Sequence, residues 1–68
     1  MNKAEEIMFE DIPTAEKLDK MIEHFKICAE YTDKNQTLEN TDAYFEQLHE
    51  ILEYIVELGR ELCKTQKI

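Results

Sequence analysis

The fold is decided by residues 38–65, LENTDAYFEQLHEILEYIVELGRELCKT, the longest stretch of regularly spaced apolar residues in the chain. Its apolar and small residues recur at alternating steps of three and four, which is the spacing of an a/d heptad seam. This spacing gathers side chains on one face of an α-helix. The seam runs through Leu38, Thr41, Phe45, Leu48, Leu52, Ile55, Gly59 and Leu62.

A second apolar row lies beside that seam. Tyr44, Ile51 and Leu58 each precede a seam residue, and Val56 and Cys63 lie on the other flank. The combined stripe is wider than one partner helix can cover, so we expect this helix to contact at least two neighbours. The residues predicted to form the core and self-association seam are Phe45, Leu48, Ile51, Leu52, Ile55, Leu58 and Leu62.

Residues 14–32 are predicted to form another long helix, because apolar residues recur there at intervals of three and four. Pro13 suits its start, since the first amide groups of a helix have no intrahelical acceptor. The stretch TDKNQTLENTD, residues 32–42, then breaks the periodicity with Asp, Asn and Thr, which favour loops and helix caps. The two long helices are therefore expected to form an antiparallel hairpin.

The segment before Pro13 is expected to be a short helix over residues 4–10, because the composition AEEIMFE favours helix. At ~1.5 Å per residue, the helix over 38–65 outruns its partner by about eight residues. We expect the N-terminal segment to cover this overhang, including Leu58, Leu62 and Cys63. The covering side chains are Ile7, Met8, Phe9 and Ile12.

Gly59 is a glycine inside a helix, which costs about 1 kcal/mol relative to alanine. It falls at a seam position. We expect either a neighbouring backbone or the Phe9 ring to cross closely there. The alternative is that the helix ends early and RELCKTQKI, residues 60–68, forms a looser tail.

The composition fits a single helical domain over residues 1–68. One Gly and one Pro in 68 residues indicate helices rather than hairpin-rich β structure. Below roughly 70–80 residues a single core seldom supplies more than ~3–5 kcal/mol, so an additional constraint is expected. The hairpin register places Cys28 and Cys63 too far apart for a disulfide, which needs Cα atoms within ~7 Å. A second copy is the remaining source of stability, and the pattern predicts a homodimeric four-helix bundle.

Charge limits the partners. Sixteen acidic against eight basic residues give a formal net charge of −8. Such a chain is repelled by phosphate backbones and by anionic membrane surfaces, so direct binding to nucleic acid or membrane is not expected. The chain shows no signal-peptide pattern and no apolar run of about 18 residues, which favours a cytoplasmic location. The expected partner is a second copy, another protein with a basic surface, or both.

Seven carboxylates form one row along the segment that decides the fold, separated by steps of three and four. Like charges at these spacings repel, at a cost of about 0.2–0.5 kcal/mol for each pair. The row is either a solvated face that keeps the protein soluble or the candidate acidic partner surface. Its members are Glu39, Asp42, Glu46, Glu50, Glu53, Glu57 and Glu61.

The sharpest chemical motif is EQLHEILE, residues 46–53, in which Glu46 and His49 have the Glu-x-x-His spacing of di-iron bundles. The glutamate row points away from the predicted core, however, and the first long helix offers no matching ligands. The chain has no serine and a single glycine, so neither a nucleophilic serine nor a phosphate-binding loop is available. We predict no catalytic, cofactor-binding or metal-ligating residues and no cofactor. A metal-binding helical bundle is the weakest alternative.

The sequence thus favours a small acidic regulator or adaptor that is not an enzyme and acts by helix-mediated association with itself, a partner protein or both. The alternative is a nucleic-acid mimic, whose carboxylate row imitates phosphates and blocks a DNA- or RNA-binding protein.

Overall fold

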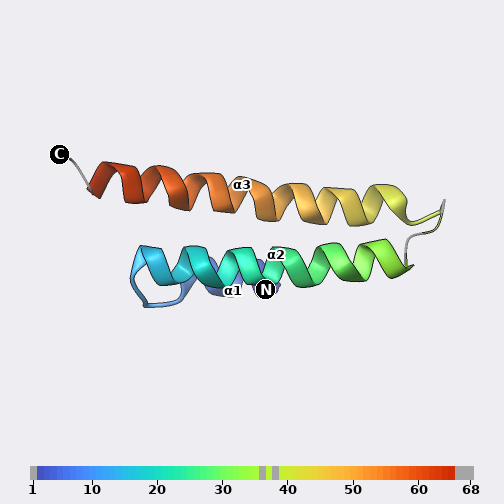
Figure 1. The fold of residues 1–68 in the computed structure, drawn as a ribbon, viewed down its shortest axis with the longest axis horizontal. Helices are drawn as coiled ribbons and strands as arrows, with labels where there is room; N and C mark the ends of the chain where they lie inside the picture. The colour runs from blue at the N-terminus through green and yellow to red at the C-terminus, as the bar shows by residue number, and fades with distance from the viewer. Residues whose placement is uncertain (1, 36, 38, 66–68) are drawn as a thin grey trace.

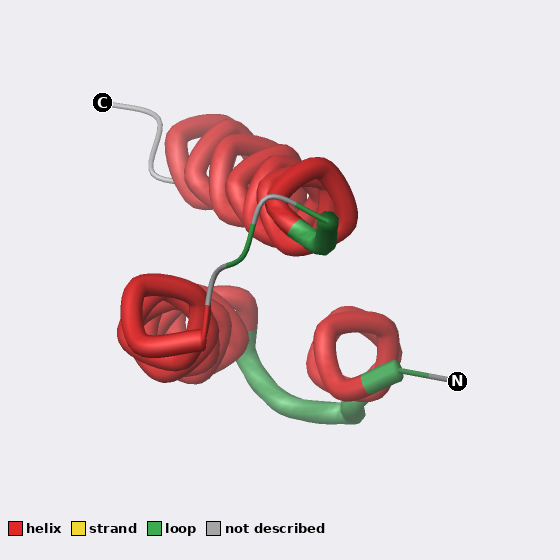
Figure 2. The backbone as a smooth tube through the Cα atoms, turned by 90° about the vertical axis from the view of Figure 1, so that its right-hand side faces the viewer, coloured by secondary structure: helices red, strands yellow, loops and turns green. Residues whose placement is uncertain are grey.

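Three helices make up the computed structural model, which describes residues 2–35, 37 and 39–65. They are α1 (Lys3–Phe9), α2 (Thr14–Asn35) and α3 (Thr41–Thr65), and the described residues include no strand. α2 and α3 run antiparallel as a hairpin (Figure 1), and α1 lies against one side of that pair (Figure 2). The prediction of an all-α chain with a short helix before a helical hairpin is confirmed.

α1 begins one residue earlier than expected because Asn2 caps it. The Asn2 side chain accepts a hydrogen bond from the backbone N–H of Glu5 at 2.9 Å, which satisfies one of the free amides of the first turn. Two lysines of α2 hold the other end. Lys17 Nζ donates to the carbonyl of Met8 at 2.8 Å, and Lys20 Nζ lies 2.7 Å from Glu10 Oε2. The lysine pairs fix the side of α2 on which α1 lies.

The turn between the long helices lies three residues later than predicted. α2 continues to Asn35, whose side chain donates to the carbonyl of Tyr31 at 2.8 Å. α3 begins at Thr41 rather than at residue 38, after a loop in which Thr37 and Asn40 bond reciprocally, each backbone N–H donating to the other's side chain, at 2.7 and 3.3 Å. The predicted seam residue Leu38 lies outside the described residues.

All three helices contribute to the core. Met21 of α2 and Ile51 of α3 are the most enclosed side chains, at 0% and 1% exposure. Partly buried residues such as Phe25 and Tyr54 pack around them. The buried apolar residues are Ala4, Ile7, Met21, Ile51 and Leu58. Because each helix contributes, removing any one of them would expose apolar side chains of the other two to water.

The predicted overhang is mostly absent, because α2 has 22 residues and α3 has 25. α1 instead runs alongside the hairpin, and its Ala4 and Ile7 enter the same core as Ile51 and Leu58. Met8 also packs there, and Ile12 is half-buried.

Two of the predicted covering contacts are wrong. Phe9 is 76% exposed, since two residues beyond Ile7 the helix has turned its side chain away from the core. Cys63 is exposed as well.

The prediction for Gly59 is also wrong. A Cβ built on Gly59 would meet nothing within 4 Å, so neither a backbone nor the Phe9 ring crosses there. The glycine borders open space on the outer side of α3.

Candidate protein-binding surface

α3 carries two heptad seams rather than one wide stripe. The inner seam faces the rest of the chain, and its side chains are buried or half-buried. It consists of Tyr44, Leu48, Ile51, Ile55, Leu58 and Leu62. The outer seam also steps by three and four, but on the neighbouring face. It consists of Phe45, His49, Leu52, Val56, Gly59 and Cys63. The side chains of the inner seam pack within the chain, and those of the outer seam remain accessible to a binding partner.

The structure therefore divides the predicted self-association seam. Ile51 and Leu58 are buried, and Leu48, Ile55 and Leu62 are half-buried. Phe45 and Leu52 belong to the outer seam and are 52% and 44% exposed. Val56, which the sequence placed on a flank, is 51% exposed and aligns with them. Sequence reasoning missed Val56 as a surface residue because its apolar character alone does not say which face it occupies.

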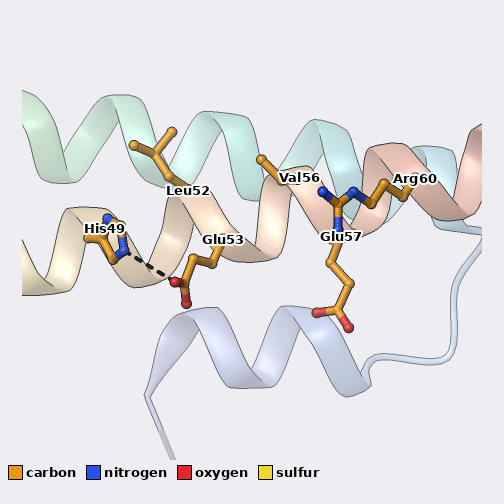
Figure 3. Close-up of a pocket in the computed structure, with 6 residues that line it drawn as sticks. All are labelled: His49, Leu52, Glu53, Val56, Glu57 and Arg60. Atoms are coloured by element: carbon orange, nitrogen blue, oxygen red, sulfur yellow. Dashed lines mark ion pairs between the residues drawn. The ribbon is translucent and has the colours of Figure 1, made fainter.

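The outer seam is a shallow groove with an acidic rim. One depression is lined by His49, Leu52, Glu53, Val56, Glu57 and Arg60, and a second by Asp42, Phe45, Glu46 and His49. The two depressions adjoin at His49 and together span residues 42–60 of α3; we refer to them together as the groove. Figure 3 shows Leu52 and Val56 projecting to one side of α3, and Glu53 and Glu57 to the other. His49 Nε2 lies 3.1 Å from Glu53 Oε1.

The carboxylate row is exposed except at one position. Glu50 is half-buried and accepts a hydrogen bond from the Tyr54 hydroxyl at 3.3 Å. Glu53 pairs with His49, whereas within residues 39–65 no ion pair reaches Asp42, Glu46 or Glu57. The other two predicted members of the row, Glu39 and Glu61, are exposed as well. Four members of the row, Asp42, Glu46, Glu53 and Glu57, thus form the acidic rim of the groove.

The opposite rim of the groove leads onto α2. At 3.6 residues per turn, Ala15, Ile22 and Ala29 lie on the flank of α2 opposite Lys17 and Lys20, which hold α1. Ala15 is exposed, and Ile22 and Ala29 are half-buried. In Figure 2, α1 lies on one side of the α2–α3 pair, and no described element covers the other side. We call this uncovered surface the open face; it comprises Ala15, Ile22, Ala29, Phe45, Leu52 and Val56.

A cysteine and a histidine meet on the side of the hairpin that faces α1. Cys28 Sγ lies 3.7 Å from His24 Nε2 and 3.9 Å from Gln47 Nε2. Burial raises the pKa of the Cys28 thiol, while burial and the nearby Lys3 ammonium lower the pKa of His24. Both shifts favour the neutral forms, which is the opposite of the thiolate–imidazolium pair that a nucleophilic cysteine needs. The structure therefore gives no support for an activated thiol at Cys28.

Metal ligands do not converge in the described part of the chain, where no group of three or more His, Cys, Asp or Glu side chains could hold an ion. Cys28 and Cys63 are both free thiols. Glu46 and His49, the residues of the Glu-x-x-His motif, line the groove on the solvent side of α3.

Comparisons of the chain with protein-family models, with curated proteins and with solved structures found no match. Within residues 2–35, 37 and 39–65, no helix has both the length and the apolar character needed to cross a membrane. Inference about function therefore starts from the surfaces of the chain itself.

Proposed function

We propose that this protein is a small acidic regulator or adaptor that acts by binding, through the open face of its helical hairpin, to a second copy, to another protein or to both. It performs no chemistry of its own. The observation that carries this proposal is the line of three large apolar side chains, Phe45, Leu52 and Val56, that are about half exposed along one side of α3.

Covering this line of side chains with a partner is favourable, because their apolar surface leaves water. Removing apolar surface from water stabilises a complex by about 25 cal/mol per Å². Side chains at steps of three, four and seven are the anchors by which a helix packs against a groove or against another helix. Contiguous exposed apolar surface with a polar rim is typical of interaction sites, whereas single exposed apolar residues are ordinary. The acidic rim adds selectivity by repelling acidic partners.

Replacing Leu52 and Val56 with Glu tests this proposal. Both side chains are exposed, so far-ultraviolet circular dichroism should show the helical content retained. Association, measured by sedimentation across protein concentrations and by affinity capture from the native cell, should weaken by at least about tenfold, because two charges would enter the contact. Ile27→Glu is the matched control, since Ile27 is 57% exposed but lies on α2 near α1. Association that survives the double substitution would contradict the proposal.

Nucleic-acid mimicry is the second candidate function, and the exposure of the carboxylate row favours it. A mimic should bind a basic protein with an affinity that falls steeply with salt, as phosphate contacts do. Changing Glu46, Glu53 and Glu57 to Gln should then abolish capture of that partner while the helices persist. Changing Glu16, Glu23 and Glu30 of α2 to Gln alters the net charge equally and should have little effect. If both triple variants bind alike, the row does not act as a mimic.

A further inference from the structure

We infer that the open face is covered by a second copy of this chain in an antiparallel arrangement. The two-fold axis runs between the two copies, at the level of Ile22 in α2 and of Glu53 in α3. The two hairpins would form a four-helix core with α1 of each copy on the outside. This inference rests on the proposed function, because it specifies one partner for the same face.

The outer seam of α3 fits itself when two copies run antiparallel. In an antiparallel pair the a residues of one helix meet the d residues of the other. One register brings Leu52 against Val56 of the second copy, Phe45 against Cys63 and His49 against Gly59. Leu52 and Val56 then cover each other, Phe45 faces the smaller Cys63, and the open space beside Gly59 receives the His49 ring. The same register covers Phe45, the end anchor of the seam.

Charge complementarity selects this register over its neighbours. It brings Glu46 beside Arg60 of the second copy, and by symmetry this attractive pair occurs twice. The repulsive contact between Glu53 and Glu53 of the second copy occurs only once. Sliding one helix by seven residues in one direction would instead place Glu46 against Glu53 of the other copy twice. Sliding it in the other direction would leave Phe45 uncovered. A parallel pair would stack Asp42 on Asp42.

α2 independently gives the same centre. Tyr31 and Tyr44 stack edge to face at 5.9 Å, and Gln47 Nε2 lies 3.9 Å from Cys28 Sγ. These contacts fix the register of the hairpin and put Ile22 level with Glu53, which is one residue from residue 54, the midpoint of the α3 seam pairs.

Around that axis the exposed flank of α2 is also self-complementary. Ile22 meets Ile22 of the second copy, and Ala15 faces Ala29. Asp19 and Lys26, both exposed, become neighbours across the contact. Two helices with unrelated sequences thus specify one symmetry axis, which a single amphipathic stripe would not do. This agreement distinguishes a second copy from a foreign basic helix, which would need only the groove of α3.

Cross-linking tests the axis directly. In a background with Cys28→Ala and Cys63→Ser, an Ile22→Cys chain should form a disulfide-linked dimer under mild oxidation, since residues on the axis come within the ~7 Å that a disulfide requires. Ala29→Cys alone should stay unlinked, because its two copies would be about 20 Å apart along the helices. Mixing Ala15→Cys and Ala29→Cys chains should give the mixed, linked dimer. Linking of the Ala29→Cys chain but not of the Ile22→Cys chain would overturn the register.

Charge reversal tests the register in the native cysteine background. Glu46→Arg and Arg60→Glu should each weaken dimerisation roughly five- to tenfold, and the double variant should recover to within about twofold of the unaltered chain. The double variant keeps the net charge, so general repulsion cannot explain the recovery. Glu30→Arg with Lys34→Glu reverses an exposed pair away from the open face and is the control. Single reversals that the double variant fails to rescue would contradict the register.

The unaltered chain separates this inference from the proposed function. A monomer at every concentration up to about the millimolar range, where dissociation constants correspond to only about 4 kcal/mol, would overturn the second copy as occupant. If that monomer bound a basic helical peptide, and Leu52→Glu abolished the binding, the proposed function would stand while this inference failed. If it bound neither, both would fail.

Discussion

An Ile51→Ala chain is expected to lose most of its helical structure at 25 °C. Ile51 is 1% exposed and lies in the core cluster with residues of α1 and α2. Truncating a buried Ile to Ala typically costs 2–5 kcal/mol, about the whole ~3–5 kcal/mol that a core of this size supplies. Circular dichroism during urea titration measures the effect, and the unfolding midpoint should move close to zero denaturant.

Leu52→Ala is the control, because it removes the same kind of side chain one position further along the same helix. Leu52 belongs to the outer seam, so its truncation should change the stability of the isolated monomer by less than about 1 kcal/mol. Any larger loss should disappear when the protein is diluted below the concentration at which it associates. Equal destabilisation by the two substitutions in dilute protein would mean that both seams of α3 are packed within one chain.

The contrast between Ile51 and Leu52 shows where sequence reasoning succeeds and where it stops. The steps of three and four over residues 38–65 predict one long amphipathic helix, and the structure contains that helix from Thr41 to Thr65. The same steps cannot say which apolar row α2 will cover, because Phe45, Ile51 and Leu52 are all large and apolar. That choice depends on how α1 and α2 together surround α3.

Local hydrogen bonds explain the differences at the helix ends. The sequence 32–42 is rich in residues that favour caps, and several of them could have ended α2. In the structure the reciprocal bonds between Thr37 and Asn40 place the turn there, so α2 keeps three more residues than predicted. Those three residues shorten the overhang and remove the end-capping role expected of the N-terminal segment.

The candidate surface was predictable only in part. The carboxylate row follows directly from the sequence, but the turn of Glu50 toward Tyr54 depends on the packed structure. The excess of apolar surface on α3 was also predictable, since one partner helix cannot cover so wide a stripe. The open face could not be predicted, because it depends on which side of the hairpin α1 occupies. On that side Ala4 and Ile7 enter the core, and Lys17 and Lys20 contact the C-terminal end of α1.

An Ile7→Asp substitution should release α1 from the hairpin, whereas Phe9→Asp should leave it in place. Ile7 is 2% exposed, and a carboxylate there would enter an apolar core without a partner, which costs several kcal/mol. The lysine contacts at Met8 and Glu10 are close to solvent and therefore weak, so they cannot hold α1 against that cost.

Released α1 would also expose Ile51 and Leu58, which share its core, so the free energy of unfolding should fall by about 3 kcal/mol or more. Amide hydrogen exchange measures the release, because the amides of residues 5–9 should exchange as fast as those of an unfolded peptide. Phe9→Asp makes the same chemical change at a side chain that already faces water, so its exchange pattern should match that of the unaltered chain. If Phe9→Asp were the more damaging substitution, the overhang-covering role predicted from the sequence would be correct, and the side of α1 that faces the core would have to be reassigned.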